Sequence, residues 1–174
     1  LQGEALTTLT SHTQCVSAVS WPVKRTIYSG SWDHSIRIWD VDTGKESSCI
    51  YSGKALNCVD VGGEGGALVA AGGSDNVLQI WDPRKPGTWH PIFQFPSHNS
   101  WVSSCKWHSK SWFHLVTASY DGKVRLFDLR TAWPVSVLES HKDKVVLCAD
   151  WWKDDSVVSG GSDNQLCIFS GISV

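Results

Sequence analysis

Residues Ser29–Asp40, SGSWDHSIRIWD, contain an aspartate, Asp33, that is followed six positions later by a tryptophan, Trp39, with two isoleucines in between. Three later stretches repeat this arrangement: Ala71–Asp82 (AGGSDNVLQIWD), Thr117–Asp128 (TASYDGKVRLFD) and Ser159–Ser170 (SGGSDNQLCIFS). The last residues of the four stretches are 42, 46 and 42 positions apart. Four matches in phase predict a repeat architecture and argue against a single site built from one of them.

Each copy has the pattern of a β-hairpin. An apolar run such as 114–119 (HLVTAS) precedes the aspartate, and an alternating run such as 123–128 (KVRLFD) follows it, with Asp-Gly, Asp-Asn or Asp-His at the turn. A further alternating segment lies upstream of each hairpin, as in 16–21 (VSAVSW), and is expected to be the inner strand of the same sheet. No stretch has a sustained helical period, so the sequence predicts an all-β fold.

A period of about 40 to 45 residues that ends in Trp-Asp is typical of β-propeller blades, and here the repeat resembles that of WD40 proteins. The resemblance predicts a single domain, 1–174, with about four blades of four-stranded antiparallel sheet at approximately 10–43, 52–88, 96–131 and 139–170. Because the family is commonly seven-bladed, we expect an incomplete arc, with a closed four-bladed ring as the alternative. Residues 4–12 (EALTTLTSH) are then expected to contain the outer strand of a preceding blade.

In the family that the repeat resembles, a histidine, a Ser or Thr, the turn aspartate and the tryptophan form a hydrogen-bonded tetrad inside each blade. The first blade matches at every position, the second lacks the histidine and has Ala71 at the hydroxyl position, and the third and fourth have phenylalanine in place of tryptophan. The tetrad residues are His12, Ser29, Asp33 and Trp39; Asp75 and Trp81; His98, Thr117 and Asp121; and His141, Ser159 and Asp163.

A serine, a histidine and an aspartate also suggest a hydrolase triad. However, the trio recurs in several blades, whereas a catalytic nucleophile is singular, exposed and placed beside an oxyanion hole. No nucleophile elbow or phosphate-binding loop occurs in the sequence. We therefore expect the tetrads to be structural and the protein not to be an enzyme.

Composition narrows the classes of partner. The net charge of −2 and the pI of about 6.4 argue against non-specific nucleic-acid binding, so any direct RNA contact is expected to be secondary. No apolar run is long enough to span a bilayer, which predicts no membrane partner.

We expect no metal and no cofactor, because Cys105 and His108 make one pair of potential ligands without a Cys-x-x-Cys motif. Cys15, Cys58, Cys105 and Cys148 lie in or beside the inner-strand segments and are expected to be buried free thiols.

A closer resemblance rests on features that the generic repeat does not require: WFH at 112–114, LRTAWP at 129–134 and DWW at 150–152. These segments are similar to the C-terminal blades of the WD-repeat subunits of the PeBoW ribosome-biogenesis complex. The resemblance implies a scaffold for maturation of the large ribosomal subunit and its ribosomal RNAs, located in the nucleus (nucleolus and nucleoplasm). It implies Pescadillo-type and Bop-type partners and the pre-ribosomal particle. The N-terminal ubiquitin-like domain of that family, which engages the ATPase midasin, and its early blades have no counterpart in the sequence.

Binding residues are expected on the rim of the propeller. By resemblance, the residue before each turn aspartate lies on the interaction face, which places Trp32 and Tyr120 there together with Trp101 and Lys144 near inner-strand starts. The alternative for Trp101 is burial within its own blade. Trp21, Trp107 and Trp151 end inner strands and are expected in the core, whereas the following lie outside the repeat pattern and are candidates for a surface: Trp89, Trp112, Trp133 and Trp152.

Two arginines suggest a rival function. Arg84 and Arg130 each follow a blade-ending aspartate by two residues, which resembles the WDxR box of cullin-RING ubiquitin-ligase substrate receptors. The other interpretation is a local ion pair within each turn, worth about 0–1 kcal/mol if exposed. Because the box occurs in many WD-repeat proteins without that role, the scaffold remains the main prediction.

Overall fold

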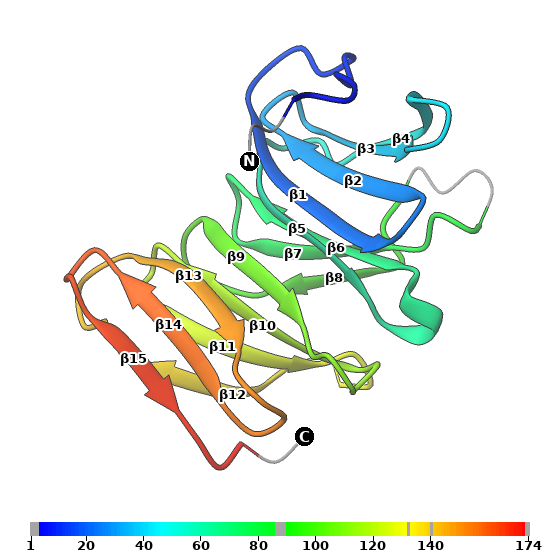
Figure 1. Ribbon diagram of the computed structural model, residues 1–174. Helices are drawn as coiled ribbons and strands as arrows, with labels where there is room; N and C mark the ends of the chain where they lie inside the picture. The colour runs from blue at the N-terminus through cyan, green and yellow to red at the C-terminus, as the bar shows by residue number, and fades with distance from the viewer. Residues whose placement is uncertain (1–3, 86–89, 132, 140, 173–174) are drawn as a thin grey trace.

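The computed structural model describes residues 4–85, 90–131, 133–139 and 141–172. Within them, the chain forms four separate antiparallel sheets, which follow one another in chain order (Figure 1). The first blade contains β1 (Val16–Val23), β2 (Thr26–Ser31), β3 (Ser35–Asp40) and β4 (Lys45–Tyr51). The second contains β5 (Leu56–Gly62), β6 (Leu68–Gly73), β7 (Val77–Trp81) and β8 (Phe93–Pro96), with a 3₁₀ turn η1 (Glu64–Gly66) after β5.

The third blade contains β9 (Val102–Trp107), β10 (His114–Ser119), β11 (Lys123–Asp128) and β12 (Pro134–Glu139). The fourth has three strands in the described residues: β13 (Val146–Trp151), β14 (Val157–Gly161) and β15 (Leu166–Phe169). In every blade, neighbouring strands in the chain are neighbours in the sheet. The turns between the second and third strands have left-handed residues directly after the aspartate at His34, Gly122 and Asn164, as short hairpin connections require.

Adjacent blades pack face to face, and an apolar core fills each junction. β6 shows how one strand serves two junctions: Val69 and Ala71 belong to the core shared with the first blade, while Leu68 and Ala70 belong to the core shared with the third. Side chains of a strand point alternately to its two faces, so a sheet covered on both sides needs apolar residues at successive positions. This is why 67–71 (ALVAA) is a continuous apolar run.

Hydrogen bonds between inner strands link the blades beside these cores. Ser17 Oγ donates to the Leu56 carbonyl at 2.5 Å, Asn57 Nδ2 to the Val102 carbonyl at 3.2 Å, and Ser103 Oγ to the Val146 carbonyl at 2.6 Å. The donors occupy the same position, the second residue of β1, β5 and β9. One bond of the same type therefore fixes each junction.

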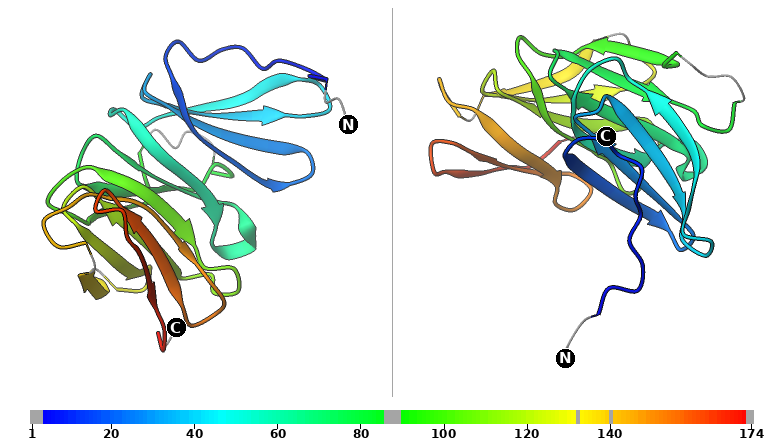
Figure 2. Two further views of the ribbon diagram at one scale, coloured as in Figure 1. Left: turned by 60° about the vertical axis from the view of Figure 1, so that its left-hand side comes forward. Right: turned by 90° about the horizontal axis from the view of Figure 1, so that it is seen from above.

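The four blades form an open arc. The first and the fourth blade lie at opposite ends of the molecule in Figure 1 and in the left view of Figure 2, and no described strand of one pairs with a strand of the other. The all-β propeller-like arc confirms the predicted fold class. The alternative prediction, a closed four-bladed ring, is wrong. Residues 4–15 form no strand, although 4–12 were expected to contain one, because no described strand lies beside them as a hydrogen-bonding partner.

Some core predictions were wrong at the ends of the arc. Trp107 is buried in the core between the second and third blades, and Trp151 is half-buried against the core between the third and fourth, whereas Trp21 is 60% exposed. Cys58 and Cys105 are buried, but Cys15 and Cys148 are exposed; all four are free thiols. Trp21 and Cys148 are in the terminal blades, each of which is covered by a neighbouring blade on one face only.

The junction between the second and third blades leaves no room for a side chain at Gly72. A Cβ there would lie 2.6 Å from Cγ1 of the fully buried Val102. We expect Gly72→Ala to lower the free energy of unfolding by about 1–3 kcal/mol, the usual cost of overpacking. Chemical denaturation would measure this. Gly160→Ala is the matched control, because its Cβ would meet only Cys148 Sγ at 3.2 Å; equal losses for the two variants would contradict the steric explanation.

Candidate functional site

The complete tetrad of the first blade forms a continuous hydrogen-bonded chain. His12 Nδ1 bonds the Asp33 carboxylate at 2.8 Å, and its Nε2 bonds Ser29 Oγ at 2.7 Å. Ser29 Oγ in turn accepts from Trp39 Nε1 at 2.8 Å. These hydrogen bonds connect the loop before β1 to the β2–β3 hairpin, so they hold the blade together at one rim.

The third and fourth blades keep the first three members of the chain. His98 lies 3.0 Å from the Asp121 carboxylate and 2.7 Å from Thr117 Oγ1. His141 lies 2.9 Å from both the Asp163 carboxylate and Ser159 Oγ. In these blades phenylalanine takes the place of the tryptophan, so the indole donor is absent.

The second blade shows what happens when the hydroxyl is missing. Ala71 pairs with Gln79 at the position where Ser29 pairs with Arg37 in the first blade. Trp81 is fully buried, and its Nε1 has no hydrogen-bond partner among the described residues. Asp75 accepts from the Val77 backbone N–H at 3.2 Å, which organises its turn without a histidine.

Electrostatics in the tetrads favour charged carboxylates. Burial alone would raise the pKa of Asp33, but hydrogen bonds from Ser35, the Thr13 N–H and His12 hold it well below its usual range. Burial is likewise outweighed at Asp121, where hydrogen bonds from His98 and the Asn99 N–H lower the pKa of the carboxyl. Burial lowers the pKa of His98 despite its contact with Asp121. The hydroxyls of these tetrads are buried and engaged, whereas a nucleophile must be reachable by its substrate.

The rim beside the tetrads carries exposed aromatic side chains. The Tyr120 N–H donates to the Trp101 carbonyl at 3.0 Å, and the two rings lie 5.8 Å apart between centroids. Trp101 is 50% exposed and Tyr120 is 41% exposed, so Trp101 is not buried within its own blade. The equivalent backbone bond joins the Trp32 N–H to the Cys15 carbonyl, and Trp32 is 49% exposed. In the fourth blade the equivalent bond joins the Ser162 N–H to the Val145 carbonyl, and Lys144, one residue earlier in the chain, is exposed.

The two WDxR arginines are held by their own turns. Arg84 donates through Nε and Nη2 to the Asp82 carboxylate at 2.9 and 3.0 Å. Arg130 donates in the same way to Asp128 at 2.9 and 2.7 Å. The hydrogen bond with each arginine lowers the pKa of its aspartate. The contacts match the local ion-pair interpretation.

Side chains outside the repeat pattern lie at the opposite rim. Trp112, Trp133 and Trp152 are exposed, while Trp89 lies outside the described residues. Sequence reasoning missed Phe93 and Phe113, which are also exposed there. The usable signal was the run SWFHL, in which aromatic residues stand between two strands, where polar turn residues are the norm.

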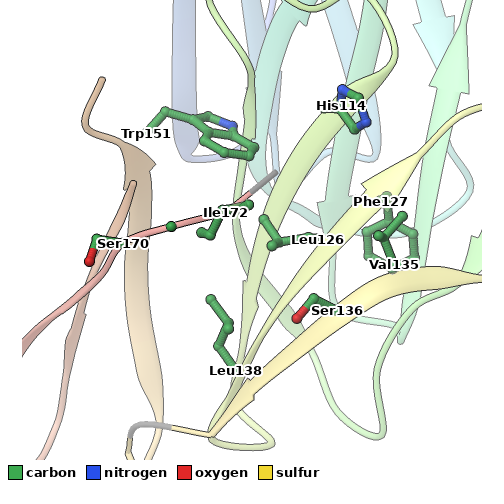
Figure 3. Close-up of a pocket in the computed structure, with 10 residues that line it drawn as sticks. His114, Leu126, Phe127, Val135, Ser136, Leu138, Trp151, Ser170 and Ile172 are labelled. Carbon is green, nitrogen blue, oxygen red and sulfur yellow. The ribbon is translucent and has the colours of Figure 1, made fainter. Parts of the chain in front are cut away.

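A cavity of about 320 Å³ lies between the third blade and the segment that follows β15. Trp151, Ile172, Leu126 and Leu138 surround it, with Ser136, Ser170 and His114 also in the lining (Figure 3). Ile172 is held there by its N–H, which donates to the Asp155 carbonyl at 2.9 Å. The lining is largely apolar, so the cavity is a gap in the junction between blades.

Within 4–85, 90–131, 133–139 and 141–172, no group of three or more His, Cys, Asp or Glu side chains is arranged to hold a metal ion. None of the helical segments in these ranges has the length and apolar character needed to cross a bilayer.

Comparison with known proteins agrees with the repeated geometry. The family model "WD domain, G-beta repeat" matches residues 3–40, 46–82, 89–128 and 132–170. The chain belongs to the WD40-repeat family. Each match ends at or near the aspartate or serine that closes the third strand of a WD40 blade.

Similar WD40 proteins carry one recurring name. The chain is 68% identical over 173 residues to "Ribosome biogenesis protein WDR12 homolog" of Oryza sativa subsp. japonica, covering 99% of the chain and 39% of that relative. It is 66% identical to the protein of the same name from Arabidopsis thaliana, covering 99% and 40%, respectively. The Chlamydomonas reinhardtii homologue is 37% identical, covering 92% and 38%. The chain thus spans about two fifths of the length of these curated relatives.

The WD40 tetrad of the first blade predicts a specific stability loss. Ser29→Ala would leave Trp39 Nε1 and His12 Nε2 without their buried hydrogen-bond partner. Trp81 Nε1 of the second blade already lacks such a partner among the described residues. We expect the free energy of unfolding to fall by about 1–3 kcal/mol, measured by chemical denaturation. Ala71→Ser is the reciprocal variant and should not destabilise by that amount, because its hydroxyl can accept from Trp81. A neutral Ser29→Ala would contradict the structural role.

The WD40 tetrads also predict a pH dependence. His98 has a pKa below the ordinary 6.5, and Asp121 has one below 3.8, so the unfolded chain binds more protons than the folded chain at acid pH. Stability is therefore complete above pH 6.5, decreases as His98 becomes protonated in the unfolded state, and decreases more steeply below pH 3.8. Denaturation midpoints between neutral and acid pH would measure this. Asp121→Asn should reduce the dependence of the denaturation midpoint on pH below 3.8. An unchanged dependence would contradict the role of Asp121 in acid destabilisation.

Proposed function

We propose that the chain serves as part of a non-catalytic protein-interaction scaffold in ribosome biogenesis, acting in maturation of the large ribosomal subunit and its ribosomal RNAs. The observation that carries the proposal is the high identity over nearly the whole chain to relatives named ribosome biogenesis proteins. The described tetrads support a non-catalytic role, because their polar groups are consumed in holding the blades.

The interaction surface that we propose is the rim with Trp101, Tyr120, Trp32 and Lys144. Large aromatic side chains dominate the energetics of protein interfaces, and Trp and Tyr supply contact area at a low cost in conformational entropy. Trp101 and Tyr120 are already placed side by side, 5.8 Å apart between ring centroids. The net charge of −2 favours a protein over RNA as the primary partner.

The partners that we propose are Pescadillo-type and Bop-type proteins within the pre-ribosomal particle, in the nucleolus and nucleoplasm. They follow from the resemblance to the WD-repeat subunits of the PeBoW complex. The ubiquitin-ligase alternative gains no support from the comparisons, since the relatives named above are ribosome biogenesis proteins and none carries a ligase name.

A pull-down from plant nuclear extract with the tagged chain would test the proposal. We expect recovery of both partner proteins and a loss of about tenfold or more with Trp101→Ala plus Tyr120→Ala, since hot-spot truncations cost about 2 kcal/mol or more. Trp152→Ala removes an exposed tryptophan at the opposite rim and should leave recovery unchanged.

Two results would argue against this. Full recovery with the double variant would exclude this rim as the site. Recovery of a cullin-RING adaptor in place of the two partners, lost with Arg84→Ala plus Arg130→Ala, would overturn the scaffold in favour of the ligase receptor.

A further inference from the structure

A second apolar surface lies at the opposite rim, between the second and third blades. Antiparallel pairing defines the two rims. Ser119 pairs with Val102, next to Trp101, whereas His114, five residues before Ser119 at the other end of β10, pairs with Asp128. The loop before His114 and the residues after Asp128 therefore lie at the far end of the third blade from Trp101 and Tyr120. They meet the loop after β5 and the start of β8 from the second blade.

Two adjoining pockets at this place share Phe93, Leu129 and Arg130, and one of them has a volume of about 270 Å³. Together they form one groove. Its apolar lining comes from both blades: Leu68, Phe93 and Phe95 from the second, and Trp112, Phe113 and Leu129 from the third. Trp112 is 57% exposed, so a partner that covered it would remove a large apolar side chain from water.

The exposure of this groove does not come from an uncovered blade face. The second blade shares one core with the first blade and another with the third, and the third shares its other core with the fourth. Both blades that build the groove are thus covered on both faces. Phe93, Trp112 and Phe113 line one pocket and are all exposed, and a contiguous group of exposed apolar side chains is characteristic of an interaction site.

Arg130 gives the groove its charge. Its guanidinium lies 4.8 Å above the ring centroid of Phe113 and is fixed through Nε and Nη2 by Asp128. The Arg130 side chain is 60% exposed while that of Asp128 is 10% exposed, so the cation faces solvent and the carboxylate faces the protein. Among the residues that the structure describes, Nη1 of Arg130 takes part in no hydrogen bond, and this donor remains for a partner.

Arg84 repeats the arrangement at the neighbouring blade end. It is 52% exposed above a buried Asp82, and Gly65 in η1 lies close to its Nη1 group. Glu64 is the acidic side chain of the groove, beside Arg84. The aspartates that hold the two arginines, Asp82 and Asp128, are buried. The charged groups that solvent reaches are therefore the guanidinium of Arg130 in the groove, that of Arg84 beside it and the Glu64 carboxylate, and this exposed face complements an acidic ligand.

We propose that this groove binds an acidic peptide segment of a partner protein, which places an aromatic or aliphatic side chain between Phe93 and Trp112 and a carboxylate on Nη1 of Arg130. The occupant follows from the charge complementarity and from the paired character of the site, an apolar slot next to a fixed cation. The site is separate from the rim proposed above and does not depend on a role in ribosome biogenesis.

A nuclear magnetic resonance titration of the ¹⁵N-labelled full chain would test this. The probe is a synthetic peptide in which phenylalanine alternates with glutamate, and the matched peptide has glutamine in place of glutamate. We expect a saturable shift of the Trp112 indole N–H signal at millimolar peptide or below, at least about tenfold weaker binding of the glutamine peptide, and an unmoved Trp101 signal. The Trp112→Phe variant assigns the indole signal.

Matched variants separate the groove from general surface effects. Arg130→Gln should weaken the glutamate peptide by about tenfold, whereas Arg25→Gln, which breaks an exposed ion pair with Asp42 in the first blade, should not. Trp112→Ala should abolish binding. Trp152→Ala should have no effect, although Trp152 also carries a cation, Lys153, over its ring at 4.3 Å.

Three results would overturn the proposal: no saturable shift, equal affinity for the two peptides, or a shift that maps to Trp101. If Arg130→Gln lowers the melting temperature enough to unfold the chain, peptide binding by Arg130→Lys and by Trp112→Ala is measured in its place. Retained binding by a folded Trp112→Ala variant would also exclude the groove.

Discussion

The structure depends on the packing of one sheet face against the next. Each junction buries apolar side chains from both of its blades, and a hydrogen bond from Ser17, Asn57 or Ser103 to a carbonyl of the following inner strand fixes the alignment. Burial supplies the free energy, since it scales with the apolar area removed from water, while the directional bond selects one register. Glycine at position 72 lets the inner parts of two blades approach closely enough for both to form.

The tetrads act at a different level, within a blade. Each joins the loop before the inner strand to the next hairpin, and so it stabilises the rim where Trp101 and Tyr120 are displayed. Their unequal preservation is tolerable because the blade-to-blade cores do not depend on them: the second blade has an unpaired Trp81 Nε1, yet it is packed on both faces. A polar network that differs between repeats while the apolar packing is kept is consistent with a structural role.

The arc has two chemically different rims. One carries Trp32, Trp101 and Tyr120 beside the tetrads, and the other carries the aromatic groove with Arg130. Both rims consist of loops on a rigid framework of strands, where binding residues are commonly placed. Two partners bound at the two surfaces proposed above would be kept apart by the strands between the rims.

The repeat of aspartate and aromatic residue determined the blade and its hairpin from the sequence alone, because these depend on local spacing. The tetrad of His12, Ser29 and Asp33 was predicted from the resemblance to WD40 proteins. The exposure of Trp21 and Cys148 was decided by tertiary structure, since an inner-strand residue is buried only if a neighbouring blade covers its face. The same holds for the groove. Phe93 and Arg130 belong to different blades and are 37 positions apart in the sequence. No local pattern relates them, and they line one site only because face-to-face packing of the second and third blades brings their rims together.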